Sequence, residues 1–321
     1  MIRKINLGFT SNNDPTDDSW AIITPSYAPD FARCQLLCES IDAFVVGTWH
    51  HYIIVSTDDL PLFAPLAGAK RSIIEKQSLL PKGMTHLPRF SKLANLLVRF
   101  MTFSLWFSWS TGFMVGWQVQ QLVKIEMACR VKETGIICCD SDLFFVRTFL
   151  LTDLIREGGY RFFRSQEEYA KADTLNSRFI TSSAKLLGLT GKLFPTAQYV
   201  DWLVTWHKPT VLAMRERISK VSRGDWRRAL ARNYFLSEYS LYGLFVDRVL
   251  TDKSKLRPDH IRLCQSIWKK TTMDDAALSK FCDSVSGAQV AIGVQSFAGV
   301  SIPRLVAQFQ RAVDREIGKT N

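Results

Sequence analysis

The stretch GIICCDSDLFFV, residues 135–146, decides how this chain is expected to fold. It opens with an apolar run, stops at two carboxylates one residue apart, Asp140 and Asp142, and continues at once with bulky apolar residues. A short, continuous apolar run of this kind is typical of a strand buried on both faces. The sequence therefore predicts that the two acids lie where a core strand reaches the surface.

Carboxylates in that position can hold a divalent cation. Mg²⁺ and Mn²⁺ prefer carboxylate oxygens and keep coordination positions open for water and for substrate phosphates. An Asp-x-Asp pair alone is common and can simply solvate a turn. The β-type residues on both sides, with no Gly or Pro between them, favour the functional interpretation. We predict that Asp140 and Asp142, with Ser141 between them, bind Mn²⁺ or Mg²⁺ and the diphosphate of a nucleotide-sugar donor.

Strands and helices alternate along the first half of the chain. Apolar runs predict strands at 20–24, 51–57 and 72–74, and apolar residues at helical spacing predict helices at 30–41 and 117–131. This alternation favours an α/β fold with a mainly parallel sheet covered by helices on both faces. Ligands of such sheets bind beyond the carboxyl ends of the strands, which here lead into Ser26 and Tyr27, and into Asp58.

The second half is expected to be more helical. It contains a predicted helix at 175–187, a last strand at 288–294 and a final helix that begins after Ser301. No internal repeat marks a domain boundary. We place a soft division near residue 190, between a nucleotide-binding core at 1–190 and an acceptor-side region at 191–321 that packs back on it; a single domain is the alternative.

Composition restricts the partners and the compartment. The 321 residues are 47% hydrophobic, which allows a large core, and the net charge of +11 favours an anionic partner. Nucleic-acid recognition motifs are absent, so we expect no nucleic acid. The seven cysteines include no CxxC pair, and the first residues lack a secretory pattern. The prediction is a cytoplasmic protein with reduced cysteines.

Two segments bear on a membrane surface. Residues 100–117 carry no charge and many aromatic rings. We expect them to form a buried or substrate-covering segment, with contact to a bilayer interface as the alternative and a spanning helix disfavoured. Residues 214–232 are rich in arginine and lysine. They form either a solvated helix face or a docking surface for anionic lipid or a phosphorylated carrier.

Several polar and aromatic side chains are further candidates. Gln120, Gln121 and Lys124 of the helix before the acidic strand either face water or contact the nucleotide and its phosphates. Two aromatic runs can stack on acceptor sugars or fill the core. Their candidate rings are Trp202, Trp206, Tyr239 and Tyr242. Glu238 is either a surface or capping residue or the group that deprotonates the acceptor hydroxyl in an inverting reaction.

Four segments together resemble a bacterial glycosyltransferase-like family of the GT-A superfamily. They are IITPSY at 22–27, GWQVQQLVK at 116–124, CDSD at 139–142 and SEYSLYG at 237–243. The resemblance implies a Rossmann-like GT-A domain with Asp140 and Asp142 at its metal-binding DxD motif. It also implies that Pro25, Ser26, Tyr27 and Asp58 border the nucleotide. A further metal ligand is expected downstream, and His207 is the candidate.

The expected function is metal-assisted transfer of a sugar to a glycan or lipid-linked acceptor. The resemblance suggests polysaccharide or lipopolysaccharide assembly, with the protein peripheral on the inner face of the cytoplasmic membrane. One alternative is a sugar-phosphate nucleotidyltransferase, although residues 24–29 lack the glycine-rich, lysine-bearing loop typical of that class. The other is a non-enzymatic basic module that docks on a membrane.

Overall fold

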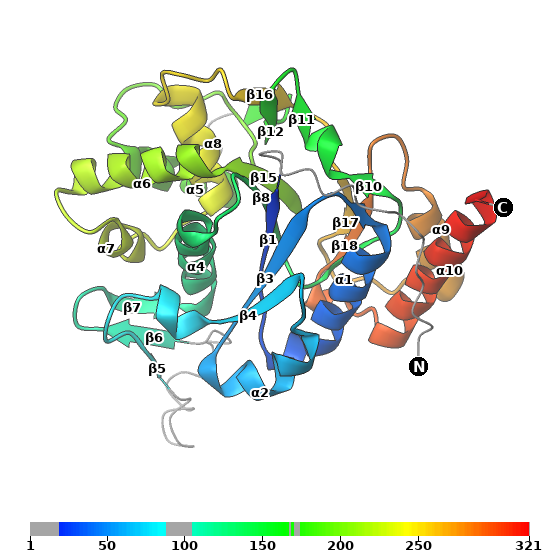
Figure 1. Cartoon of the computed structure of the whole chain (residues 1–321). Helices are drawn as coiled ribbons and strands as arrows, with labels where there is room; N and C mark the ends of the chain where they lie inside the picture. Colours follow the sequence, from blue (N-terminus) through cyan, green and yellow to red (C-terminus); the bar gives the residue numbers. More distant parts are fainter. Residues whose placement is uncertain (1–18, 88–104, 167, 170–173, 321) are drawn as a thin grey trace.

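Five strands form the main sheet of the computed structural model, which describes residues 19–87, 105–166, 168–169 and 174–320 (Figure 1). The strand order is β15-β8-β1-β3-β4. Four of these strands are parallel, and β15 runs antiparallel to β8. Their bounds are β1 Trp20–Pro25, β3 Trp49–Val55, β4 Arg71–Glu75, β8 Gly135–Cys139 and β15 Leu203–His207. The predicted α/β fold with a mainly parallel sheet is confirmed.

Helices cover both faces of the sheet because successive strand residues point to opposite sides. Ala21 and Ile23 of β1 join the core on the side of α4 (Gly116–Arg130), whereas Trp20 and Ile22 join the core on the side of α1 (Phe31–Phe44). Figure 1 shows α4 and α1 on opposite sides of the strands. Burial of each large apolar side chain contributes roughly 1.5–3 kcal/mol.

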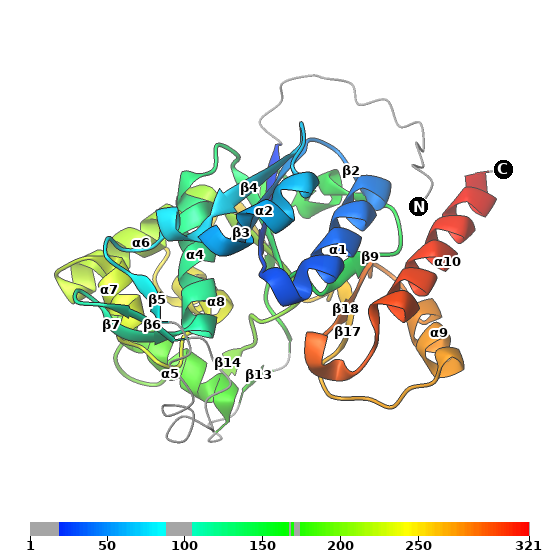
Figure 2. The same cartoon turned by 90° about the horizontal axis from the view of Figure 1, so that it is seen from below.

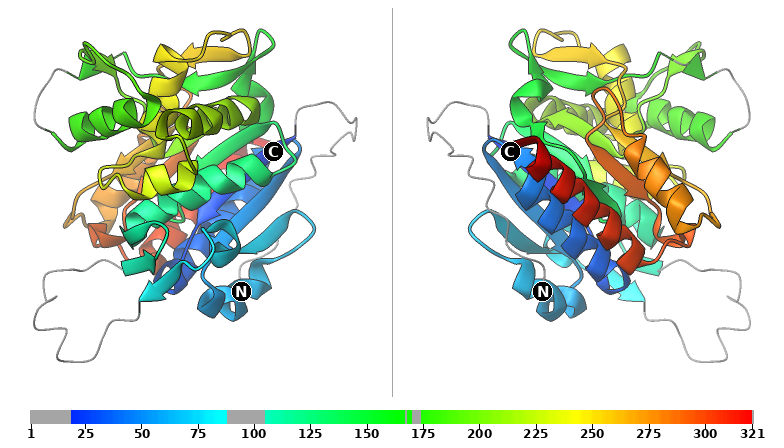
Figure 3. Two further views of the ribbon diagram at one scale, coloured as in Figure 1. Left: turned by 90° about the vertical axis from the view of Figure 1, so that its left-hand side faces the viewer. Right: turned by 90° about the vertical axis from the view of Figure 1, so that its right-hand side faces the viewer.

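A second, three-stranded sheet lies beside the main one and has the order β17-β18-β9. Its strands are β9 (Leu143–Phe145), β17 (Cys264–Ile267) and β18 (Ala291–Val294). Helix α10 (Ile302–Thr320) runs alongside α1 (Figure 3, right), and the Phe44 and Phe309 rings meet at 6.0 Å. Residues beyond 190 thus supply β15 of the main sheet and β17 and β18 of the second sheet. The domain boundary near residue 190 stays a prediction.

The remaining elements surround these two sheets. Helices α5, α6, α7 and α8 lie on the α4 side, and the hairpin β6–β7 projects near α7 (Figure 2). Helix bounds are α2 Leu60–Phe63, α5 Leu175–Leu187, α6 Lys208–Ser222, α7 Trp226–Ala231, α8 Glu238–Arg248 and α9 Asp275–Asp283. Strand bounds are β2 Val45–Val46, β5 Thr85–Leu87, β6 Leu105–Ser108, β7 Gly112–Val115, β10 Phe149–Leu150, β11 Ile155–Arg156, β12 Gly159–Phe163, β13 Glu168–Tyr169, β14 Thr196–Ala197 and β16 Leu256–Asp259.

The uncharged segment at 100–117 is a hairpin followed by the start of α4 where the structure describes it. Its first residues, 100–104, and the polar start of the chain at 1–18 lie outside the described residues. The basic segment at 214–232 is shared between α6 and α7. Within the described ranges, no helix combines the length and the apolar character needed to cross a membrane.

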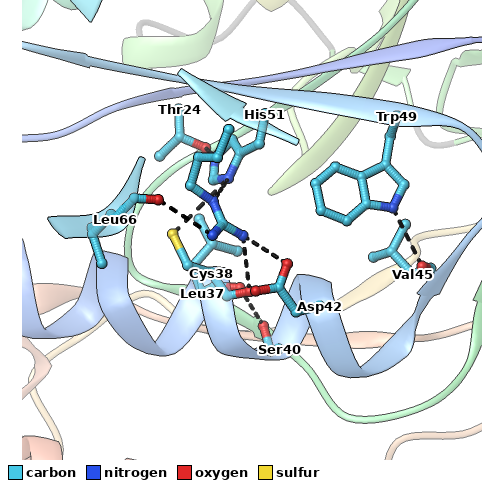
Figure 4. Close-up of polar contacts among 10 residues, drawn as sticks. Thr24, Leu37, Cys38, Ser40, Asp42, Val45, Trp49, His51 and Leu66 are labelled. Carbon is cyan, nitrogen blue, oxygen red and sulfur yellow. Dashed lines mark hydrogen bonds and ion pairs between the residues drawn. The ribbon is translucent and has the colours of Figure 1, made fainter. Parts of the chain in front are cut away.

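A partly buried polar network ties α1 to three strands (Figure 4). Arg71 Nε lies 3.2 Å from His51 Nδ1, and an arginine N–H can only donate, so Nδ1 accepts. His51 Nε2 then donates to Thr24 Oγ1 at 3.0 Å. Arg71 also donates to the Cys38 carbonyl at 3.2 Å and pairs with Asp42 at 2.8 Å. The network fixes α1 beside the carboxyl end of β1.

Candidate functional site

The chain reverses its strand order between β1 and β8. From β1 the sheet extends through β3 to β4 on one side, and β8 lies on the other side. In open parallel sheets, ligands bind in the crevice beyond the carboxyl ends of the two strands at this switch point. Those ends carry Tyr27 after β1 and the Asp140–Asp142 turn after β8. The topology therefore puts the predicted acidic pair at the expected place for a ligand.

Asp140 is held from the side of α4. Its Oδ1 accepts from Gln120 Nε2 at 3.3 Å and pairs with Lys124 Nζ at 2.7 Å. Lys124 is only 1% exposed, whereas the Asp140 side chain is 36% exposed. Burial disfavours the ammonium, but Asp140 and then Glu238 outweigh it and raise the pKa of Lys124 well above its ordinary value. Lys124 is therefore a buried, permanently charged partner of an accessible carboxylate.

Glu238 completes this group from the first turn of α8. Its Oε1 lies 3.0 Å from Lys124 Nζ, which also donates to the Tyr239 hydroxyl at 3.1 Å. The Gln121 amide faces the Glu238 carboxylate and accepts from Trp117 Nε1 at 3.2 Å. Burial raises the pKa of Glu238, and Lys124 opposes that shift. Glu238 is 2% exposed, so its geometry favours holding Lys124 over direct contact with an acceptor hydroxyl.

Asp142 is held from the side of the loop that follows β18. Its Oδ2 accepts from the Ser296 backbone N–H at 3.2 Å, while its buried Oδ1 has no hydrogen-bond partner among the described residues. Burial, then the charges of Asp140 and Asp30, raise the pKa of Asp142 to about 7, and Arg33 opposes them. The charges of Asp140 and Asp30 thus act on Asp142, and its Oδ1 accepts no hydrogen bond from the residues that the structure describes.

Arg33 fixes the loop that carries Ser296. Its guanidinium donates to the carbonyls of Val294 and Val300, each at 3.0 Å. Burial raises the pKa of Asp30, Arg33 opposes that shift, and Asp140 adds to it. An acid after the first strand, Asp30, and a polar pair after the last strand, Gln295 and Ser296, are the sequence signals for this side of the site. Asp30 stands at the N-cap of α1, but its side chain makes no capping hydrogen bond.

Asp140 and Asp142 suit a cation that takes few protein ligands. The orphaned Asp142 Oδ1 and the accessible Asp140 carboxylate supply the hard oxygens that Mg²⁺ and Mn²⁺ prefer. In the part of the chain that the structure describes, no three or more His, Cys, Asp or Glu side chains are arranged as a metal site. Mg²⁺ commonly binds one or two carboxylates and completes its shell with water and substrate phosphates. The residues present therefore fit an ion that arrives with a diphosphate.

His207 does not belong to this group, which corrects its prediction as a metal ligand. In the antiparallel register it pairs with Gly135, at the opposite end of β8 from Asp140. Gly135 and Cys139 are four residue steps apart along the strand, which is roughly 13 Å. His207 Nδ1 instead lies 3.0 Å from Thr210 Oγ1. The antiparallel direction of β15 explains the error, because the sequence does not show which end of a strand meets a neighbour.

The residues predicted to border the nucleotide differ in accessibility. Pro25 and Ser26 are buried, and the Ser26 hydroxyl lies close to the Cys34 thiol. Tyr27 is 47% exposed and can contact a ligand. Asp58 faces solvent, whereas the next residue, Asp59, accepts from Ala28 N at 3.3 Å and from Ser56 Oγ at 2.7 Å. Asp59 therefore joins the two strand-end loops. Ser141 is buried between the two acids.

The four rings predicted to bind an acceptor are buried, which corrects that prediction. Trp206 stacks on Tyr242 with ring centroids 5.5 Å apart and also contacts Tyr239. The Tyr242 hydroxyl accepts from His207 N at 3.0 Å. Trp202 is covered as well and contacts Trp268 at 4.9 Å. Their apolar surface is already used by the core, so none of them offers a free face to a sugar.

The structure is that of an α/β protein with two aspartates at the switch point of a mainly parallel sheet. Residues 21–314 match a family described as a family of unknown function (DUF6492), and the chain belongs to this family. No curated protein matches the sequence.

Proposed function

We propose that this protein is a metal-dependent glycosyltransferase of the GT-A type. It would move a sugar from a nucleotide-sugar donor to a glycan or lipid-linked acceptor, in polysaccharide or lipopolysaccharide assembly at the cytoplasmic face of the membrane. The observation that supports this best is the pair Asp140 and Asp142 at the carboxyl end of β8, where one buried carboxylate oxygen has no partner among the described residues. That arrangement suits a cation bound together with a diphosphate.

Each residue of the site has a role in this proposal. Asp140 and Asp142 would hold Mn²⁺ or Mg²⁺, which when bound supplies charge neutralisation for the departing nucleoside diphosphate. Lys124 and the Ser296 N–H fix the two carboxylates from opposite sides. The exposed Tyr27 ring can pack against the nucleoside.

Calorimetric titration with UDP, GDP and CMP, in Mn²⁺ and in EDTA, tests the proposal. We expect binding of at least one nucleotide in Mn²⁺, its loss in EDTA, and at least a hundredfold weaker binding to Asp142→Asn, about 2.7 kcal/mol. Asp153→Asn is the matched control, because Asp153 is an exposed acid in the short 3-10 helix at Leu151–Leu154. Metal-dependent binding that survives Asp142→Asn would remove this assignment. Release of nucleotide from a panel of donors then identifies the donor.

A further inference from the structure

A surface pocket of about 630 Å³ lies between α5 and the segment at 232–235. Figure 2 shows α5 on the same side of the molecule as α7 and α8. Three cationic side chains line the pocket, those of Arg178, Lys185 and Arg232, and its described lining includes no acid. Hydroxyl groups and the rings of Tyr234 and Phe235 line the rest. Its chemistry therefore suits an anion that also carries polar groups and a flat apolar face.

Side-chain packing and hydrogen bonds fix the walls of the pocket. Helix α5 buries Phe179 and Ile180 on one side and turns Thr181 and Lys185 towards the pocket. The Arg178 guanidinium lies over the Phe235 ring at 5.1 Å. On the facing wall, Asn233 accepts from Ser182 Oγ at 3.3 Å. These contacts hold both walls in place before any ligand binds.

The pocket adjoins the group around Lys124. Phe235 precedes Glu238 by three residues, which span at most about 10 Å. The buried face of α5 contacts the same group, because Phe179 packs on Trp117 with ring centroids 5.3 Å apart and the Trp117 indole contacts Gln121. The pocket wall at Phe235 is therefore joined by a short stretch of chain to Glu238, which contacts Lys124.

We propose that this pocket binds the acceptor through an anionic saccharide, an inference that rests on the proposed function. Arginine and lysine would hold a phosphate or carboxylate carried by the sugar. The hydroxyl groups of α5 would bind sugar hydroxyls, and the aromatic rings would pack on the apolar face of the sugar ring. Acceptor binding, which the sequence analysis assigned to the buried rings of Trp202, Trp206, Tyr239 and Tyr242, is thus proposed for this pocket instead.

Titrations of the full chain with glucose 1-phosphate, galacturonate, glucose and inorganic phosphate test this inference. We expect at least one charged sugar to bind tenfold or more tightly than glucose, and Lys185→Gln/Arg232→Gln to lose tenfold or more of that affinity. Lys269→Gln/Lys270→Gln removes the same charge from exposed lysines elsewhere and should bind like the wild type. The two charged sugars distinguish a phosphate from a carboxylate as the anionic group.

Three outcomes would overturn the inference. They are equal affinity of the two double variants, no preference for a charged sugar over glucose, and inorganic phosphate binding as tightly as every charged sugar. Nucleotide binding in Mn²⁺ separates this inference from the proposed function, because Lys185→Gln/Arg232→Gln should leave it unchanged. Sugar-phosphate binding without any nucleotide binding would remove the glycosyltransferase proposal and leave the pocket as a saccharide site.

An independent observation concerns the hairpin β6–β7. Its inner face buries Trp106 and Met114, while its outer face presents Phe113 at 64% exposure and Trp109 at 95% exposure. Phe107 joins them, with ring centroids 5.3 Å from Trp109 and 4.9 Å from Phe113. These three rings, the aromatic tip, form an apolar face without a cover among the described residues.

Basic charge lies next to the aromatic tip. Helix α7 contacts β7, and Figures 1 and 2 both show the two side by side. Residues 208–232 contain eight lysines and arginines and two acids, and Arg223 and Arg228 are exposed. Tryptophan and phenylalanine favour the bilayer interface, and clustered basic residues attract anionic headgroups. We infer that the aromatic tip and α7 together dock on the surface of an anionic membrane.

Sedimentation with phosphatidylcholine vesicles, with and without phosphatidylglycerol, tests the docking surface. We expect binding only to the anionic vesicles, a blue shift of tryptophan fluorescence, and at least tenfold weaker binding of Trp109→Ser/Phe113→Ser. Leu62→Ser/Leu150→Ser, which alters exposed apolar residues elsewhere, is the control. Equal binding of the two double variants, or equal binding to neutral vesicles, would overturn the inference. So would dimerisation that Trp109→Ser/Phe113→Ser abolishes without any vesicle binding.

Discussion

Replacing Lys124 by methionine tests the central electrostatic feature of the site. The ammonium is 1% exposed and lies 2.7 Å from Asp140 Oδ1 and 3.0 Å from Glu238 Oε1. At an effective dielectric constant of about 20, each contact is worth roughly 6 kcal/mol before desolvation is subtracted. Removing one partner of a buried pair leaves the other charge unpaired and typically costs about 3–5 kcal/mol. We expect Lys124→Met to lower the free energy of unfolding by that amount at pH 7.5.

Urea unfolding followed by circular dichroism in EDTA measures this loss. The double variant Lys124→Met/Glu238→Gln should recover a large part of it, because a neutral glutamine removes the unpaired buried carboxylate. Lys220→Met, at an exposed position of α6, is the matched control and should stay within about 0.5 kcal/mol of the wild type.

The loss in Lys124→Met should also depend on pH. Without Lys124, burial of Glu238 is unopposed by its main positive neighbour, so its pKa in the folded protein lies further above the unfolded value. A raised carboxyl pKa stabilises the fold at low pH, and this contribution is lost as pH rises. The deficit should therefore be smaller at pH 5 than at pH 7.5. A variant within about 1 kcal/mol of the wild type, or a double variant no better than the single one, would refute this reasoning.

Two further substitutions have defined expectations. Burial raises the pKa of Asp142 to about 7, whereas an aspartate in the unfolded chain has a pKa near 4. Folding therefore takes up a proton at Asp142, and the free energy of unfolding falls as pH rises from about 4 to about 7. In urea unfolding with EDTA, Asp142→Asn should be more stable than the wild type by about 1–3 kcal/mol at pH 8 and nearly equal to it at pH 4. The same dependence of unfolding free energy on pH in both proteins would contradict this. Gly293→Ala would place a methyl group 2.5 Å from the Trp202 ring, so we expect a loss of about 1–3 kcal/mol in thermal unfolding. Gly68→Ala, which meets nothing within 4 Å, should be nearly neutral, and equal melting temperatures for the two variants would show that the strand yields freely.

Local patterns in the sequence were sufficient to find most of the elements around the site. The apolar runs at 20–24 and 135–139 became β1 and β8, and the predicted helix at 175–187 became α5. The position of Asp140 and Asp142 at the end of a buried strand also followed from the sequence, because the apolar run stops there. Such patterns are readable because strand and helix periodicities depend on neighbouring residues.

Only the tertiary structure decided which side chains meet. Lys124 and Glu238 are 114 residues apart, and nothing local indicates that a buried ammonium joins them. Because β15 is antiparallel to β8, His207 lies at the end of β8 opposite to Asp140. Trp206 and Tyr242 lie in the core because they pack against residues distant in the sequence. Strand direction and burial depend on contacts between distant segments. Sequence patterns can therefore predict where a strand ends but not which strand or side chain lies beside that end.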